Sequence, residues 1–385
     1  MKKHQKHAKL NRPGLGRFGR NEWAILGTTC GNIKQMAYQV IRSLSERYRL
    51  GYADADHGGE RGEVQSGEDA MGAGAHFQYI DKIGYHRFDT RSEMSEFQYR
   101  HWCNELDAVI VNGNHFPAGR QIVVIDPVKE KSLKKRIDQL TKVDLILLAD
   151  GVERPYDWLL AEMPELEEVE VMSLSEISRL ADLIDRQLTE ARPPLYGLVL
   201  AGGKSERMGQ DKSEISYHGK PQREYLAELL EGYCRRVFVS CRQDQVEEMG
   251  AEREVIADSF LGLGPYGAIL SAFRQHPDAA WLVVACDLPL LNGAAVQQLR
   301  SGRDSSRVAT AFHNPKTGFP EPLITIWEPR AYPVLFQFLA QGYSCPRKVL
   351  INSEIALVKP EHPETLMNAN QPSEAEKARK ILNLR

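Results

Sequence analysis

A strand-like run that passes into a glycine-rich, cationic segment is the clearest sign of chemistry in this sequence. Residues 198–212 read LVLAGGKSERMGQDK, and their apolar start is typical of a buried strand. Gly202 and Gly203 follow, and glycines let backbone N–H groups approach an anion closely. Arg207 and Lys212 would neutralise that anion. The segment matches neither G-x-x-x-x-G-K-[ST] nor G-x-G-x-x-G, so it predicts a different kind of phosphate-binding loop.

A second chemical group is a carboxylate at the end of an apolar run. Residues 281–290 read WLVVACDLPL, which predicts a strand ending at Cys286 with Asp287 at its carboxyl edge. Open α/β sheets bind ligands at that edge. A carboxylate there suits a hard divalent cation, which prefers oxygen ligands and shares them with phosphates and water. A lone Asp after a strand is otherwise usually a turn former.

The elements that would position these groups alternate along the chain. This alternation predicts α/β domains with mostly parallel sheets. Two prolines in the segment TEARPPL, residues 189–195, stop a helix and favour an extended linker. We therefore expect a basic, mobile tail over 1–20 (open to a phosphate or partner contact), a first domain over 21–190, a linker over 191–195 and a second domain over 196–385. Strands are expected at 23–27, 108–112, 121–125, 143–149, 196–201, 236–240, 254–256, 281–286 and 323–327, and helices at 33–47, 174–188, 221–231, 265–275, 293–300, 330–340 and 374–384.

The pattern L-A-G-G-x-S-x-R-M-G-x-D-K, residues 200–212, resembles the nucleotide-binding loop of nucleotidyltransferases. Within that class it is most similar to the molybdenum cofactor guanylyltransferases, the MobA family. The resemblance covers residues 195–385. It implies a Rossmann-like three-layer nucleotidyltransferase domain, with Leu200, Ala201, Gly202 and Gly203 at the nucleotide. Arg207 and Lys212 would then be catalytic cations on its phosphates.

Further segments carry the same resemblance. It implies that Asp258, in REVIADSF, contacts the nucleotide, and that Asp287, in the C-D-x-P signature, is a catalytic Mg²⁺ ligand. The segment GFPEPL resembles the pterin-binding segment of the family and implies contacts from Glu321 and Pro322. The segment NANQPSE resembles N-x-N-T-P-E, which makes Asn368 and Asn370 either substrate contacts or structural residues.

The resemblance implies a reaction in which a substrate phosphate attacks the α-phosphorus of GTP and releases pyrophosphate. The product would be the guanine dinucleotide form of the molybdenum cofactor, with molybdopterin as acceptor and Mg²⁺ as cofactor. One departure concerns the base, because Ser240 follows the second strand where the family often has Asn. A cytidylyltransferase acting on the same pterin and a non-catalytic cofactor-binding scaffold are the alternatives.

The first half resembles the MobB family, the GTP-binding adapter of the same pathway, which has a P-loop. The segment ILGTTCGNIK, residues 25–34, precedes an expected helix, but Asn32 and Ile33 stand where Gly and the phosphate-binding Lys belong. Asn112 replaces an expected acid in DAVIVNG. We therefore expect a P-loop-like domain that has lost, or nearly lost, NTP hydrolysis and that holds the cofactor or docks a molybdoenzyme. Four further residues of this half are either metal ligands or solvated loop residues: Asp54, Asp56, His57 and His76.

The composition of the chain argues against several other classes of protein. The chain has 385 residues, 42% hydrophobic and 26% charged, with a formal net charge of -3. That balance argues against nucleic-acid or membrane attraction, and no apolar run approaches a membrane span. The 6 cysteines form no C-x-x-C pair, so we expect reduced thiols and a cytoplasmic protein.

Overall fold

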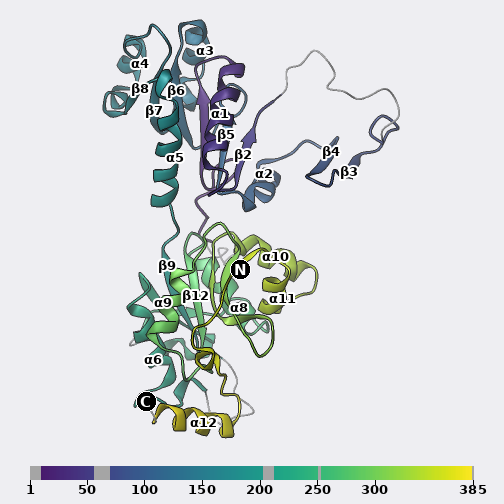
Figure 1. The fold of residues 1–385 in the computed structure, drawn as a ribbon, viewed down its shortest axis with the longest axis vertical. Helices are drawn as coiled ribbons and strands as arrows, with labels where there is room; N and C mark the ends of the chain where they lie inside the picture. Colours follow the sequence, from purple (N-terminus) through teal and green to yellow (C-terminus); the bar gives the residue numbers. More distant parts are fainter. Residues whose placement is uncertain (1–9, 56–69, 203–211, 250–252, 384–385) are drawn as a thin grey trace, which may run out of the picture. The chain divides into compact units, whose positions relative to one another are not determined.

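The computed structural model describes residues 10–55, 70–202, 212–249 and 253–383, and its contacts divide the chain into two compact units (Figure 1). The first unit is Leu15–Glu190. The second is Ala191–Arg385 together with Met1–Gly14. Each unit has its own sheet and its own apolar core.

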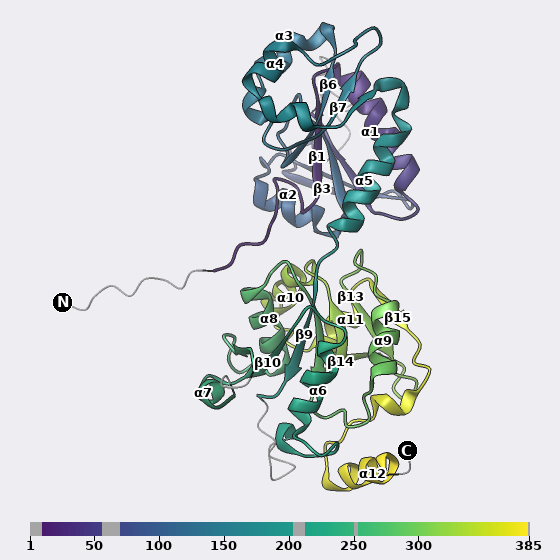
Figure 2. The same ribbon diagram turned by 90° about the vertical axis from the view of Figure 1, so that its left-hand side faces the viewer.

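The first unit is built on a 6-stranded sheet in the order β2-β5-β1-β6-β7-β8, and every pair in it is parallel. Apolar side chains of α1 and α5 cover one face, and those of α3 and α4 cover the other (Figure 2). A separate hairpin joins β3 to β4. The bounds are β1 Glu22–Leu26, β2 Leu50–Ala53, β3 Phe77–Asp81, β4 His86–Thr90, β5 Ala108–Asn112, β6 Arg120–Ile125, β7 Val143–Leu148, β8 Val171–Ser173, α1 Cys30–Leu44, α2 Glu96–Trp102, α3 Glu130–Lys134, α4 Asp157–Glu162 and α5 Ser178–Glu190.

The second unit is built on a 7-stranded sheet in the order β11-β10-β9-β12-β14-β13-β15. Only β14 runs antiparallel to its neighbours among these described strands. Side chains of α6 and α9 pack on one face, and those of α8, α10 and α11 pack on the other. The bounds are β9 Leu195–Leu200, β10 Arg236–Cys241, β11 Val255–Ala257, β12 Ala280–Ala285, β13 Ala309–His313, β14 Pro320–Trp327, β15 Ile355–Val358, α6 Gln222–Glu231, α7 Val246–Met249, α8 Pro265–Gln275, α9 Gly293–Ser301, α10 Ala331–Ala340, α11 Pro346–Ile351 and α12 Pro372–Leu382.

Both units are therefore three-layer α/β structures, as the alternation in the sequence predicts. The expected strand at 323–327 begins earlier, at Pro320, so Glu321 and Pro322 lie inside β14. The expected helix at 174–188 starts as a 3₁₀ turn, Leu174–Glu176, before α5. Strand β13 was not expected, because its short sequence ATAFH is neither long nor strictly alternating.

The interpretation of residues 1–20 as a tail differs from the structure in the second half of that segment. Phe18 is 3% exposed and packs with strand residues of the first unit. The carboxylate of Glu22 accepts from the N–H groups of Arg17 and Phe18, at 2.9 and 2.7 Å. Within the second unit, the N–H of Gly14 donates to the Asp278 carboxylate at 3.0 Å. The buried Phe18 ring and the buried Glu22 carboxylate account for the packing of residues 17–18. The basic composition of the segment does not indicate this packing.

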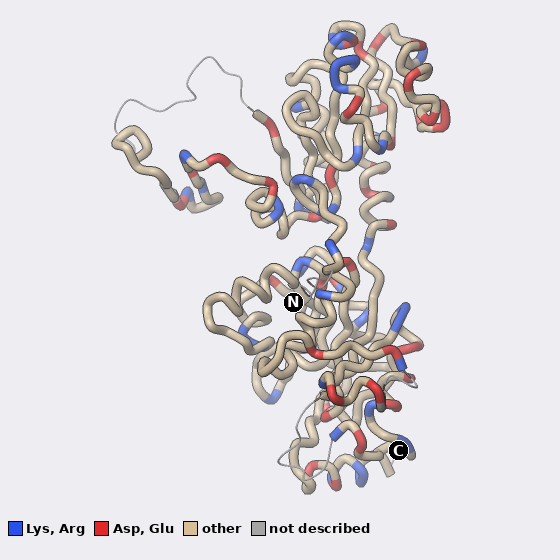
Figure 3. Tube along the Cα trace, turned by 180° about the vertical axis from the view of Figure 1, so that it is seen from behind, with Lys and Arg blue, Asp and Glu red and all other residues tan. Residues whose placement is uncertain are grey.

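Charged residues of both signs are interspersed along both units (Figure 3). No helix within the described residues has the length and apolar character needed to cross a membrane. The net charge of -3 is thus spread over a mixed surface.

Candidate functional site

The carboxyl ends of the parallel strands of the second unit bring several of the expected site residues to one edge. Strand β9 lies between β10 and β12, and Leu200 is in register with both Ser240 and Ala285. The loops that begin after these strands therefore start side by side. A Cβ atom on Gly202 would lie 3.2 Å from the backbone N of Arg242. Glycine thus lets the loop after β9 pass tightly over the end of β10.

Lys212 and Asn370 are 158 positions apart in the sequence and meet at this edge. The Lys212 Nζ donates to the Asn370 Oδ1 at 2.5 Å. The N–H of Ala369 donates to the backbone carbonyl of Asp287 at 2.8 Å. The C-terminal segment is thereby tied to the loop after β12, and the Lys212 ammonium is held near Asp287.

The Asp287 carboxylate is in an environment that favours a nearby cation. Its Oδ1 is buried and has no hydrogen-bond partner among the described residues. Burial raises the pKa of Asp287, the charge of Lys212 opposes that rise, and the negative charges of Glu321 and Glu374 add to it. A buried carboxylate facing like charges is costly unless a cation compensates it.

Two other carboxylates organise the surroundings of Asp287. Glu321 is 3% exposed, and its Oε2 accepts from the Asn314 Nδ2 at 3.0 Å. Glu374 accepts from the N–H groups of Asn370 and Gln371 at 2.7 and 3.0 Å, which fixes the start of α12. Pro322 is buried beside Glu321 in β14, and Asn368 lies in the segment that leads to Asn370.

A polar pair lies at the ends of β10 and β11. The Ser240 Oγ donates to the Asp258 Oδ1 at 2.9 Å, and the N–H of Asp258 donates to the Cys241 carbonyl at 3.0 Å. Burial raises the pKa of Asp258, and the hydrogen bond from Ser240 opposes that rise. Ser240 therefore has a partner that the sequence alone did not reveal.

Four residues named from the sequence lie outside the described residues: Gly203 and Arg207 of the second unit, and Asp56 and His57 of the first. Within the described part of the chain, no group of three or more His, Cys, Asp or Glu side chains is arranged to hold a metal. The Asp287 carboxylate by itself suits Mg²⁺ better than a transition metal, because Mg²⁺ is commonly held by one or two carboxylates together with substrate phosphates and water.

The P-loop-like segment of the first unit has a different chemistry. Gly27 adopts a φ of 94°, and a Cβ there would lie 2.2 Å from the Val124 carbonyl oxygen. Ile33, at the position of the phosphate-binding Lys, is 0% exposed in the core. The Lys34 Nζ lies 5.7 Å from the centre of the Tyr38 ring. No cation therefore follows this loop at the position that a P-loop requires.

A parallel sheet with carboxylates and a lysine at its carboxyl edge is typical of nucleotide-binding α/β enzymes, and comparison with known proteins specifies the class. Residues 197–356 match the MobA-like NTP transferase domain. The second unit therefore contains a MobA-like nucleotidyltransferase domain. The first unit lies outside the matched residues.

Named relatives agree with this assignment. A "Molybdenum cofactor biosynthesis bifunctional protein" of Synechocystis is 37% identical over 48% of this chain. The alignment covers 53% of that relative, so the chain spans about half its length. A "Molybdenum cofactor guanylyltransferase" of Pseudomonas putida is 25% identical over 48% of this chain and 97% of the relative. The solved structure of a molybdopterin-guanine dinucleotide biosynthesis protein A from Archaeoglobus fulgidus, 23% identical, covers 49% of this chain and 100% of its own, with a TM-score of 0.43.

Proposed function

We propose that the second unit transfers GMP from GTP to molybdopterin and releases pyrophosphate. The match to the MobA-like domain and the guanylyltransferase names of the relatives support this reaction. The observation that carries the proposal is the buried, unpartnered Oδ1 of Asp287 at a strand end, with Lys212 acting on it. These groups suit a nucleoside triphosphate with its divalent cation.

The roles of the residues follow from their charges and positions. The backbone of Leu200, Ala201 and Gly202, with Gly203, would face the nucleotide phosphates. Lys212, held by Asn370, would neutralise charge on those phosphates, and Arg207 would add a second cation. Asp287 would hold Mg²⁺, which when bound neutralises phosphate oxygens. Transfer then depends on positioning and charge neutralisation, because a phosphate acceptor is already ionised at neutral pH.

The acceptor and the base would be recognised by separate groups. Glu321, Pro322, Asn368 and Asn370 are the proposed pterin contacts. The Asp258 carboxylate, oriented by Ser240, is the proposed base contact, because a carboxylate accepts two hydrogen bonds and guanine offers two adjacent N–H donors.

We also propose a cytoplasmic location and a molybdoenzyme as final recipient. The six cysteines, all without a disulfide, are consistent with a reducing compartment.

The test is pyrophosphate release by the full chain with molybdopterin, Mg²⁺ and each of GTP, CTP and ATP. We expect GTP to be preferred, and Asp287→Asn to lower the rate about 100-fold or more, the scale of losing a group that stabilises transition-state charge. Glu376→Gln is the matched control, because it removes a carboxylate from a surface ion pair with Lys380 in the same unit.

Each other result assigns a different function. Full Mg²⁺-dependent turnover in Asp287→Asn would remove Asp287 from the metal site. Preference for CTP would make the domain a cytidylyltransferase. Absence of turnover and of binding with every nucleotide would leave a cofactor-binding scaffold.

A further inference from the structure

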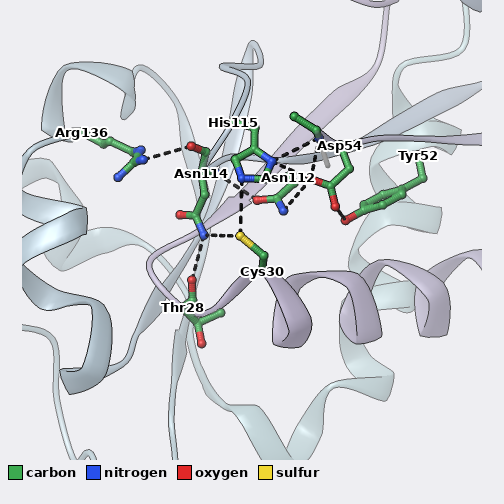
Figure 4. Close-up of polar contacts among 9 residues, drawn as sticks. Thr28, Cys30, Tyr52, Asp54, Asn112, Asn114, His115 and Arg136 are labelled. Atoms are coloured by element: carbon green, nitrogen blue, oxygen red, sulfur yellow. Dashed lines mark hydrogen bonds and ion pairs between the residues drawn. The ribbon is translucent and has the colours of Figure 1, made fainter. Parts of the chain in front are cut away.

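A cluster of polar side chains occupies the carboxyl edge of the first unit's sheet (Figure 4). Cys30 is the first residue of α1. Asp54 directly follows β2, and His115 comes shortly after β5. Because β2, β5 and β1 are adjacent in the sheet, the three side chains are brought together although Cys30 and His115 are 85 positions apart.

The three side chains form a chain of contacts. The Cys30 Sγ lies 3.5 Å from the His115 Nε2, and the His115 Nδ1 lies 2.7 Å from the Asp54 Oδ1. The His115 side chain is only 7% exposed, so its ring is held in place. A nucleophile in reach of a base, with the base oriented by a third group, is the arrangement of an activated nucleophile.

Asp54 is fixed as a carboxylate. Burial raises the pKa of Asp54, but hydrogen bonds from the Tyr52 hydroxyl, the Ala55 N–H and His115 outweigh burial and lower the pKa. The Tyr52 hydroxyl donates at 2.6 Å and the Asn112 Nδ2 at 2.8 Å. The Ala55 N–H lies 3.1 Å from the His115 Nδ1, but it is closer to the Asp54 Oδ1, at 2.8 Å. Because an ionised carboxylate only accepts hydrogen bonds, the 2.7 Å contact between the Asp54 Oδ1 and the His115 Nδ1 places the proton on that nitrogen. The Nε2, which faces the Cys30 Sγ at 3.5 Å, is then the nitrogen that accepts the thiol proton.

The surroundings of Cys30 suit a developing negative charge. Cys30 begins a helix of 15 residues, and the positive end of a helix stabilises a thiolate. The first N–H groups of a helix, here those of Cys30 and Gly31, have no acceptor within the helix. The Asn114 Nδ2 lies 3.6 Å from the Sγ and is held by donating to the Thr28 carbonyl at 2.9 Å.

The residue that follows Cys30 in α1 is an exposed glycine. A Cβ atom built on Gly31 would have nothing within 4 Å among the described residues. Cys30 itself is half-buried and is a free thiol. An electrophilic carbonyl that approaches over Gly31 would therefore be adjacent to Cys30 and to the first turn of α1.

We propose that Cys30, His115 and Asp54 form a nucleophilic triad that accepts the acyl group of an activated ester or thioester. The Sγ–C bond forms as the thiol proton passes to the His115 Nε2. The carbonyl oxygen takes the negative charge at the N–H groups of Cys30 and Gly31. The ester or thioester C–O or C–S bond then breaks, and the leaving alcohol or thiol takes the proton from His115. Water attacks the acyl-cysteine with His115 as base, giving a carboxylic acid and regenerating the thiol.

The first experiment compares two thiols within the full chain. Iodoacetamide at pH 6.5 is followed by mass spectrometry at Cys30 and at Cys345, which is exposed. We expect Cys30 to react about ten times faster than Cys345, and His115→Gln to abolish that difference. A purely structural His115 would predict the opposite, because loosening the cluster would expose Cys30 and leave its rate unchanged or higher. Equal rates for the two thiols in the parent chain would overturn the proposal.

The second experiment tests the acyl donor, with p-nitrophenyl acetate as the probe. We expect a burst of one p-nitrophenolate per chain, acetyl attached to Cys30, and loss of both in Cys30→Ala but not in Cys345→Ser. Lack of the burst, or protection of Cys30 by one equivalent of Zn²⁺ without acetyl transfer, would overturn the triad. Guanylyl transfer by Cys30→Ala is measured alongside, so that a failure of the triad is distinguished from a failure of the proposed function.

Discussion

Lys212 is the residue to which we assign the largest share of the proposed phosphate chemistry. Its ammonium donates to Asn370 at 2.5 Å while its charge acts on the buried carboxylate of Asp287. Lysine binds phosphate as a compact point charge on a flexible stem, so an anchor that limits its motion increases its effect. Asn370 is that anchor, and it is fixed in turn by Glu374.

We predict that Lys212→Met lowers guanylyl transfer about 100-fold, because it removes a charge from the transition state. Asn370→Ala should lower it only about tenfold, because the charge remains but is less well placed. Steady-state kinetics of pyrophosphate release measure both. Lys220→Met, which breaks a surface ion pair with Glu228, is the control. Equal losses in the two variants would mean that anchoring Lys212 is not the main role of Asn370, and that its proposed pterin contact contributes most of the effect.

The hydroxyl of Ser240 controls the Asp258 carboxylate. Removing its hydrogen bond in Ser240→Ala should raise the pKa of Asp258 further, since burial alone already raises it. Only the ionised form can accept a hydrogen bond on each of its two oxygens, as the proposed contact with guanine requires. Affinity for GTP should therefore fall as pH decreases through that pKa, and the fall should begin at a higher pH in Ser240→Ala. The loss of one hydrogen bond is worth about 1 kcal/mol, or about fivefold in affinity.

Calorimetric titration of GTP between pH 5 and pH 8 measures this effect. Thr317→Ala, at an exposed hydroxyl of the same unit, is the control. An identical pH profile in Ser240→Ala and the parent chain would separate Asp258 from base recognition.

A buried ion pair fastens the start of β9 to the rest of the second unit. The Arg303 Nε donates to the Glu328 Oε1 at 2.6 Å, with side chains 8% and 0% exposed. The same guanidinium donates through Nη2 to the Pro193 carbonyl at 2.9 Å. Arg303, which comes after α9, therefore holds the segment before β9. Glu328, which directly follows β14, holds Arg303 in turn.

We predict that Arg303→Ala lowers the free energy of unfolding of the second unit by about 3–5 kcal/mol, because it leaves Glu328 buried without a partner. Lys380→Ala, which breaks an exposed pair with Glu376, should cost at most about 1 kcal/mol. Urea denaturation followed by circular dichroism compares the two. A loss below about 1 kcal/mol in Arg303→Ala would show that water reaches Glu328.

The order of the elements could be predicted from sequence because buried parallel strands are short apolar runs between helices. The segments AVIVN and WLVVA, for example, gave β5 and β12 almost to the residue. The antiparallel direction of β14 could not be predicted, because direction depends on pairing rather than on local composition.

The candidate sites likewise contain residues that could be placed from the sequence and contacts that could not. Asp258 directly follows β11, and Asp287 comes two residues after the end of β12, so their edge of the sheet was predictable. The contacts of Lys212 with Asn370 and of Cys30 with His115 join residues 158 and 85 positions apart, and no local pattern encodes such distances. For Cys30, a useful signal was present but unused: a cysteine at a helix start in a loop that lacks the P-loop lysine.

At the scale of the whole molecule, the chain carries two large sheets with separate cores. Among the described residues, the groups that we propose for nucleotide binding lie at the edge of the second unit's sheet. In the first unit, Ile33 is buried where a P-loop places its lysine, and the hydroxyl of Thr28 donates to Asp126 at 2.6 Å. In the second unit, Lys212 and Asp287 meet at the sheet edge. A ligand stabilises only the unit that binds it.

We therefore predict two unfolding transitions in calorimetry of the full chain, of which GTP with Mg²⁺ raises only one. At 100 times the dissociation constant the added stability is about 2.7 kcal/mol, enough to raise that transition by several degrees. Arg303→Ala, which destabilises the second unit alone, identifies the transition that belongs to it. Asp287→Asn should reduce the shift without moving the other transition. A GTP-dependent rise of the remaining transition would mean that the first unit binds nucleotide despite Ile33, and would contradict the prediction that only the second unit is stabilised.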